Sequence, residues 1–179
     1  GDGVEQDPLQ AFSMFQRIAD QYSLARPNTP NWQFSADALV QLGNYYKNGI
    51  EDTDIQADRN KAQIMYTTAA MVFRHAGAQF ELGRMQLYDG KGFGEPRLGI
   101  RNLSLAYKKG HVGAEALLGY SIFEGEYIKR NPVRGLIMLC NALSRSNEYD
   151  AEWITPLYEE VLSLATPEQR MEANEQHCN

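Results

Sequence analysis

Three histidines and two cysteines are the side chains best suited to acid–base, metal or redox chemistry. The histidines His75, His111 and His177 lie far apart, and the chain has no H-E-x-x-H signature, P-loop or C-x-x-C pair. His111 follows a Lys-Gly turn, where we expect it to cap or pack a helix. A pH-sensing role is the alternative, because histidine titrates near neutral pH. No catalytic constellation stands out, so we expect neither enzymatic activity nor a bound cofactor or metal.

The two cysteines occupy different environments in the sequence. Cys140 falls on an apolar helical stripe and is expected to be buried, whereas Cys178 lies near the C-terminal end. An oxidising compartment would permit a disulfide between them. The residues alone leave open whether they are bonded or are one buried thiol and one tail thiol.

The composition is that of a folded chain with an acidic balance. Its 179 residues are 43% hydrophobic and 22% charged, and 17 Lys and Arg residues face 23 Asp and Glu residues, for a net charge of −6. This composition excludes a disordered chain. Broad nucleic-acid binding is not expected, because it requires a basic surface that neutralises phosphates. The longest apolar runs are too short for membrane insertion.

A repeated motif organises most of the chain. The pattern Ala-x-x-x-Leu-Gly occurs at residues 38–43, 78–83 and 114–119. After each copy come a glycine-containing loop, a residue suited to begin a helix, and two small residues seven positions apart. These later positions are Asp58, Ala62 and Ala69; Glu95, Gly99 and Ala106; and Asn131, Gly135 and Ala142. A period of this length is typical of a solenoid.

The chemistry of the repeat predicts a helical hairpin. Asp or Asn can cap the second helix, and proline is tolerated at its first position. Glycine inside a helix costs about 1 kcal/mol relative to alanine. Its recurrence at Gly43, Gly83 and Gly119 therefore indicates that two helices cross closely there. The stretch at residues 90–94 superficially resembles a phosphate loop, but it follows a predicted helix and is explained by the repeat.

The expected fold is all-α, a solenoid of antiparallel helical hairpins. We expect repeats over residues 1–145 and capping helices over residues 146–179. The first repeat lacks its first helix, which suggests a fragment or truncated chain, and the exposed half-repeat could drive self-association. The expected helices cover residues 8–24, 33–48, 58–75, 77–88, 96–109, 112–124, 132–146, 151–164 and 167–176.

Three side chains are candidates for contact with a protein partner: Tyr45, Arg84 and Tyr120. They lie off the packing register of the first helix of each hairpin, which lines the concave face of such arrays. Tyrosine and arginine are frequent interface anchors. Residues 97–134 are mainly basic and residues 135–179 mainly acidic. This asymmetry indicates either an ordinary solvated surface or a bipolar one that steers a charged partner.

The combined motif is similar to the Sel1-like repeat, a relative of the tetratricopeptide hairpin, and the similarity covers about residues 1–145. Among Sel1-repeat proteins, the chain resembles the ExoR family of periplasmic regulators from rhizobia and related alphaproteobacteria. The segments that carry this narrower resemblance are residues 11–22, the Pro-rich break that follows, and residues 38–46, 103–106 and 134–139.

The resemblance implies a periplasmic, non-enzymatic negative regulator. Members of the family are thought to bind the periplasmic sensor domain of a membrane histidine kinase and to repress two-component signalling. Proteolytic loss of the regulator, which implies a periplasmic protease as a second partner, then changes exopolysaccharide, motility and host-association programmes. The alternative is a general Sel1 scaffold with several protein partners. A wall-active hydrolase is disfavoured, because the cysteine pair in each repeat of such proteins is missing here.

Overall fold

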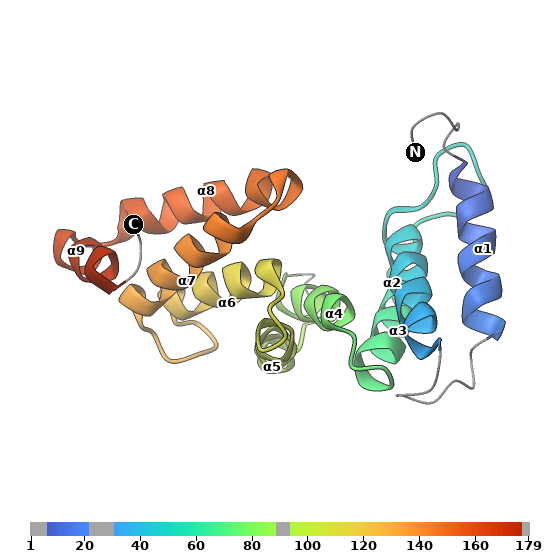
Figure 1. Cartoon of the computed structure of the whole chain (residues 1–179), viewed down its shortest axis with the longest axis horizontal. Coiled ribbons are helices and arrows are strands. Elements are labelled where there is room, and N and C mark those ends of the chain that lie inside the picture. Colours follow the sequence, from blue (N-terminus) through green and yellow to red (C-terminus); the bar gives the residue numbers. More distant parts are fainter. Residues whose placement is uncertain (1–6, 22–30, 89–93, 177–179) are drawn as a thin grey trace. The chain divides into compact units, whose positions relative to one another are not determined.

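The described part of the chain is helical. The computed structural model describes residues 7–21, 31–88 and 94–176, and this part contains helices and turns without a strand. The observation confirms the all-α prediction, and Figure 1 shows the helices in chain order. They are α1 (Pro8–Gln21), α2 (Trp32–Asn48), α3 (Arg59–Met71), α4 (Ala76–Tyr88), α5 (Pro96–Tyr107), α6 (Val112–Glu124), α7 (Pro132–Arg145), α8 (Glu148–Leu164) and α9 (Pro167–Gln176).

The end of α3 is the clearest departure from the expected helix boundaries. The sequence predicted a helix over residues 58–75, but α3 ends at Met71. Arg74 adopts a left-handed backbone with φ of 54°, and the equivalent position one repeat later is Gly110, with φ of 83°. Glycine is the usual residue at such a helix end. Because arginine occupies position 74, the sequence carried no sign that the helix stops there.

Side-chain caps begin several of the second helices, as the repeat predicted. The carboxylate of Asp58 accepts a hydrogen bond from the Lys61 backbone N–H at 3.0 Å, and Asn131 accepts one from Arg134 at 3.1 Å. Glu95 occupies the corresponding position before α5 but makes no side-chain cap. Glutamate is outside the set of short polar residues that cap well.

The chain divides into two units, Gly1–Leu82 and Gly83–Asn179, and the division falls inside α4. In the first unit, α2 packs against both α1 and α3. Phe12 of α1 meets the rings of Tyr45 and Tyr46 edge-on, with centroids 5.7 and 5.5 Å apart. Such edge-to-face pairs add to the free energy gained by burying the rings.

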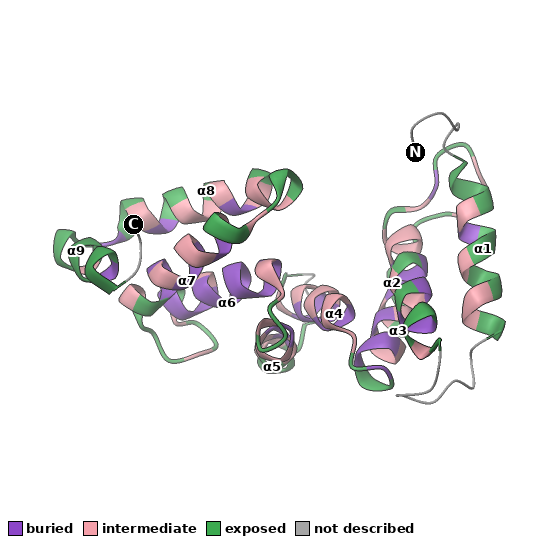
Figure 2. Ribbon diagram, viewed as in Figure 1, coloured by how far each residue is buried: buried purple, intermediate pink, exposed green. Residues whose placement is uncertain are grey.

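Helix α6 is the centre of the second unit. Ten of its thirteen residues are buried, and it packs against α5, α7 and α8. Figure 2 shows buried positions along most of α6, whereas α9 is mostly exposed. One core joins α6 to α7, α8 and α9 through residues such as Phe123, Leu139, Ile154, Val161 and Ala173. The terminal helices therefore cover the end of the repeats with apolar contacts.

The motif glycines lie where helices approach most closely, as predicted. A Cβ added to Gly43 would meet the ring of Tyr66 at 2.4 Å. A Cβ on Gly119 would lie 3.0 Å from the carbonyl oxygen of Gly135, and one on Gly135 would lie 2.7 Å from that of Gly119. Gly83 makes the equivalent approach to α5. A methyl group at Gly119 or Gly135 would press on backbone atoms, whereas one at Gly43 would displace the Tyr66 ring.

We expect Gly135→Ala to lower the free energy of unfolding by about 1–3 kcal/mol, the usual cost of overpacking a tight contact. Denaturant unfolding followed by circular dichroism measures this change. Gly77→Ala is the matched control, because its Cβ would meet only the His75 ring, at 3.2 Å. We expect the control to be neutral or stabilising, since alanine favours helix by about 1 kcal/mol over glycine. An equal loss of stability in both variants would contradict this account.

Candidate partner-binding surface

Tyr45 contributes to packing inside the first unit. Its ring lies 5.7 Å from that of Phe12 and 6.3 Å from that of Phe15, so it helps to hold α1 against α2. The side chain is half-buried. The register of Tyr45 in the sequence predicts a partner contact and gives no sign of this packing role. Its contact with a partner stays a prediction.

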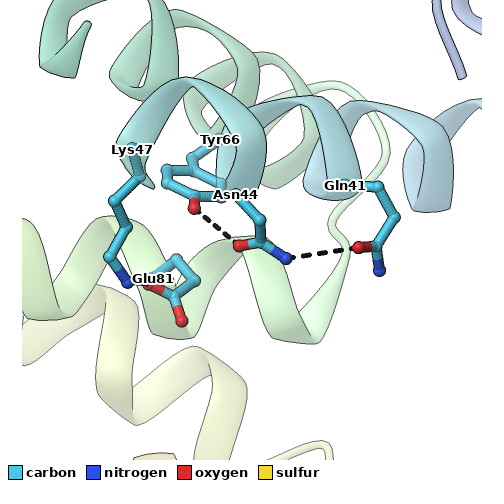
Figure 3. A network of polar contacts seen from close by, with 5 residues as sticks. All are labelled: Gln41, Asn44, Lys47, Tyr66 and Glu81. Carbon is cyan, nitrogen blue, oxygen red and sulfur yellow. Dashed lines mark hydrogen bonds and ion pairs between the residues drawn. The ribbon is translucent and has the colours of Figure 1, made fainter. Parts of the chain in front are cut away.

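The residue after the first motif glycine, Asn44, is the centre of a polar network drawn in Figure 3. The Tyr66 hydroxyl donates a 2.7 Å hydrogen bond to Asn44 Oδ1, and Asn44 Nδ2 donates a 3.4 Å bond to Gln41. Tyr66 is fully buried. Because a buried hydroxyl without a partner is costly, the bond to Asn44 explains how α3 can place a tyrosine against α2.

An ion pair links α2 to the first half of α4. Lys47 Nζ lies 3.0 Å from Glu81 Oε2, and the side chains are 30% and 17% exposed.

Burial of the Tyr66 hydroxyl raises its pKa well above the usual value, and the negative charge of Glu81 raises it further. Tyr66 is therefore a neutral hydrogen-bond donor at physiological pH.

Two histidines begin the first helices of successive repeats. His75 Nδ1 accepts a hydrogen bond from the Ala78 backbone N–H at 3.2 Å, and His111 Nδ1 accepts one from Ala114 at 3.3 Å. The opposite ring nitrogen of His75 lies 2.9 Å from Asp37 Oδ1. The capping role expected for His111 is confirmed, and His75 shares it. His177 lies outside the described residues.

The other two candidates, Arg84 and Tyr120, belong to the second unit. Arg84 is half-buried on α4. The Tyr120 hydroxyl donates a 3.2 Å hydrogen bond to Glu160 Oε1 and so joins α6 to α8. Partial burial, then the charge and hydrogen bond of Glu160, raise the pKa of Tyr120 to about 12. Nothing in the sequence near Glu160 indicates that this carboxylate pairs with a side chain on α6.

A buried carboxylate lies at the other end of α6. Glu115 is buried, and its side chain is held by the guanidinium of Arg145 at the end of α7. Removing one partner of a buried ion pair is costly, because it leaves an uncompensated charge. The pair therefore ties α6 to α7 and is a structural contact.

The remaining features considered in the sequence are metal ligands, the two cysteines, the glycine-rich loop and membrane-spanning segments. Among the described residues, no group of three or more His, Cys, Asp or Glu side chains is arranged to hold a metal ion. Cys140 is disulfide-bonded, and Cys178, the other cysteine of the sequence, lies outside the described residues. Most of the glycine-rich loop at residues 90–94 also lies outside them. None of the described helices has both the length and the apolar character needed to cross a membrane.

The repeat register seen in both units matches a known repeat family. The sequence model of the Sel1 repeat matches residues 1–23, 36–71, 76–111 and 112–147. The chain belongs to the Sel1 repeat family. The matched segments include the glycine crossings of all three hairpins. The Sel1 repeat protein of Oxalobacter formigenes shares the fold, with a TM-score of 0.57 and 19% identity over 80% of this chain and 96% of that chain.

Two regulators are similar to this Sel1 chain over nearly all its length. The exopolysaccharide production negative regulator of Rhizobium meliloti (strain 1021) is 34% identical over 170 residues, which cover 95% of this chain and 61% of that protein. The protein of the same name from Rhizobium leguminosarum bv. viciae is 34% identical over 173 residues, 97% of this chain and 62% of that protein. The chain thus spans about three fifths of the length of these relatives.

The raised pKa of Tyr120 predicts how the second unit responds to alkali. Folding raises this pKa above 10.0, so the protonated hydroxyl stabilises the folded state. The stabilisation is fully present below pH 10 and is lost as pH rises through about 12. In an ultraviolet titration of tyrosine ionisation, we expect Tyr120→Phe to remove part of the late absorbance change. Glu160→Gln should move that part to lower pH, because the neighbouring negative charge is gone. A late transition that is unchanged in both variants would contradict the assignment.

Proposed function

We propose that this chain binds the periplasmic sensor domain of a membrane histidine kinase and represses its two-component signalling. The observation that carries the proposal is the 34% identity over 95% of the chain to an exopolysaccharide production negative regulator. Sel1 repeats act through protein–protein contacts, and the two units present half-exposed side chains on α2, α4 and α6 for such contacts. We retain Tyr45, Arg84 and Tyr120 as the proposed contact residues.

Repression would work by a shift of the kinase between two states. A bound regulator changes a conformational equilibrium only if it binds one state more tightly than the other. The regulator would therefore bind the inactive sensor domain more tightly than the active one. To move a kinase from about 99% active to about 99% inactive, the affinities must differ by about 10⁴-fold.

The cellular setting proposed for this chain is the periplasm. The disulfide bond of Cys140 supports an oxidising compartment, where such bonds persist. Proteolysis of the regulator by a periplasmic protease would release the kinase, and exopolysaccharide, motility and host-association programmes would change in response. The name of the two relatives, negative regulators of exopolysaccharide production, supports this direction of control.

Calorimetric titration of the chain into the isolated sensor domain of the cognate kinase tests the proposal. We expect a saturable one-site isotherm at neutral pH. Tyr120→Ala should weaken binding by about tenfold or more if this tyrosine is an interface anchor. Tyr149→Ala is the matched control, because it truncates a tyrosine that is 78% exposed on α8 and lies outside the proposed contact residues. We expect the control to change the affinity by no more than about twofold.

The outcomes separate the regulator from the general scaffold. Binding to the sensor domain that is selective over unrelated periplasmic domains supports the regulator. If the sensor domain gives no heat and a pull-down captures several unrelated proteins, the kinase proposal fails and the scaffold is favoured. Equal affinity of the two tyrosine variants would remove Tyr120 from the proposed contact residues.

A further inference from the structure

Helix α5 carries a line of basic side chains along one face. Arg97, Arg101 and Lys108 are all exposed, and Lys108 continues the helical backbone as the residue that caps the C-terminal end. Spacings of four and seven residues place side chains on the same face of a helix. We call these three residues the basic stripe. It extends about 16 Å along the helix axis, at a rise of about 1.5 Å per residue.

The opposite face of α5 packs into the second unit. Gly99, Leu103 and Ala106 are buried, and the first two lie against α4. The side chain of Asn102 donates a 2.8 Å hydrogen bond to Gln86 on the same helix α4. A helix that buries one face presents the other to solvent. The basic stripe therefore lies on the side of α5 that the packing of this unit does not use.

The arginines of the basic stripe oppose the stability of their own helix. Arg97 stands in the first turn of α5, which has no acidic residue, and a positive charge there opposes the helix dipole. Arg97 and Arg101 are four residues apart, and like charges at this spacing destabilise a helix. Lys108 lies at the other end, where a positive charge is favourable. Helix stability therefore does not explain the two arginines.

The repeat does not require basic residues at these positions. Counted from the residue before each second helix, the counterparts of the basic stripe are Leu9, Ser13 and Asp20 on α1, Asn60, Ile64 and Met71 on α3, and Val133, Ile137 and Ser144 on α7. None of these residues is basic. The same register thus carries different chemistry in each hairpin, and only α5 makes it cationic.

The helices packed against α5 leave the charge of the basic stripe uncompensated. Its three side chains make no ion pair with a described residue. Residues 83–88 of α4 include no carboxylate, and on α6 the buried Glu115 is held by Arg145. Glu95, just before α5, is exposed and offsets at most one of the three charges. Residues 89–93 lie outside the described part and contain one acidic and one basic residue.

The segment that follows α6 adds no net charge beside α5. Its carboxylates Glu124 and Glu126 are exposed, and Lys129 and Arg130 of the same segment balance them. Arg130 packs against Gly125, between the two carboxylates in the sequence, and its guanidinium donates a 3.0 Å hydrogen bond to a backbone carbonyl at the end of α6. The basic stripe therefore stays net positive when the charges of every neighbouring element are counted.

Exposed cations in a line are suited to a row of carboxylates. Arginine donates paired hydrogen bonds to a carboxylate, and lysine adds a compact positive charge. In an extended peptide, alternate side chains lie on one side at intervals of about 6.6 Å. Arg97 and Arg101 are separated by about 6 Å along the helix axis, which is close to that interval. A peptide with acidic residues at alternate positions would therefore meet successive cations of the stripe.

We propose that the basic stripe binds an acidic segment of a protein partner. Charge complementarity selects the occupant, and an anionic membrane is a poorer match. The whole chain has a net charge of −6, so a broad negative surface would repel the rest of the molecule. The inference goes beyond the proposed function, whose contact residues lie on the first helices α2, α4 and α6. It does not require the partner to be a kinase.

A synthetic peptide tests the basic stripe directly. The probe is an amidated nonapeptide in which glutamate alternates with glycine, with a neutral fluorescent label at its N-terminus. The comparison peptide has glutamine in place of glutamate. Binding to the whole chain is measured by fluorescence anisotropy and mapped by NMR chemical-shift changes. We expect the glutamate peptide alone to bind, with shifts concentrated on α5. The affinity should fall several-fold between about 50 and 300 mM salt, as screening increases.

A triple variant removes the charges of the basic stripe. Arg97→Gln with Arg101→Gln and Lys108→Gln should weaken binding of the glutamate peptide by about tenfold or more. Thermal unfolding distinguishes a docking role from a structural one. We expect this variant to unfold at the same or a higher temperature, because the repulsion between the two arginines is gone.

A second triple variant is the matched control. Arg17→Gln with Lys61→Gln and Arg134→Gln removes the same residue types and changes the net charge equally. These side chains are exposed on α1, on α3 and at the start of α7. We expect the control to change the affinity for the glutamate peptide by no more than about twofold, since its charges lie away from the stripe.

Several results would overturn the inference. They are the absence of binding by the glutamate peptide, equal loss of affinity in the two triple variants, binding that does not depend on salt, and a clear drop in the unfolding temperature of the stripe variant. Vesicles of phosphatidylglycerol supply the alternative ligand. Binding to the vesicles that needs the stripe, without binding to the peptide, assigns the surface to a membrane and overturns the proposal.

Titration of the kinase sensor domain separates this inference from the proposed function. Failure of the wild-type chain to bind the sensor domain, with peptide binding still specific to the stripe, overturns the proposed function alone. Selective binding of the sensor domain, with no binding of the glutamate peptide, overturns the inference about the stripe alone.

Discussion

The close approach of two helices at a glycine is the constraint on which the rest of the structure depends. At Gly119 and Gly135 each backbone carbonyl oxygen lies within 2.7–3.0 Å of the point where the other residue would carry a Cβ, so α6 and α7 pack at a distance that favours glycine at both positions. This packing compensates for the unfavourable helix propensity of glycine. Gly43 solves the same problem differently, because it receives the ring of Tyr66 instead of a second glycine.

The glycine crossings set the spacing of the helices. The positions next to these glycines can therefore hold different residue types in different repeats. The residue after the motif glycine is Asn44 in one repeat, Arg84 in the next and Tyr120 in the last. Asn44 accepts the hydroxyl of a buried tyrosine, whereas Tyr120 reaches across to Glu160 on the following helix. A repeat array thus keeps one backbone arrangement and varies its surface side chains from repeat to repeat. Such folds acquire specific partners in this way.

The second unit combines a rigid interior with a polar outer surface. Its core continues from α6 through α7 to the terminal helices, and the Glu115–Arg145 pair adds a charged contact between α6 and α7. Tyr120 and Glu160 lie on α6 and α8 of this unit, so the hydrogen bond between them joins side chains on packed helices. Groups that are already ordered lose less conformational entropy when a ligand binds. This arrangement favours recognition of a partner surface, in keeping with a family whose relatives are regulators.

The sequence by itself determined the helices, the caps at Asp58 and Asn131, and the glycine crossings, because each depends on local chemistry or on a spacing that recurs in every repeat. Its register also singled out Tyr120, which the structure shows half-buried against the core of the second unit. The tertiary structure alone decided that α3 ends before Arg74, that Tyr45 packs on Phe12, and that Tyr120 bonds to Glu160. These contacts join residues distant in the chain, and they exist only when the rotation and separation of the packed helices bring the two side chains within reach.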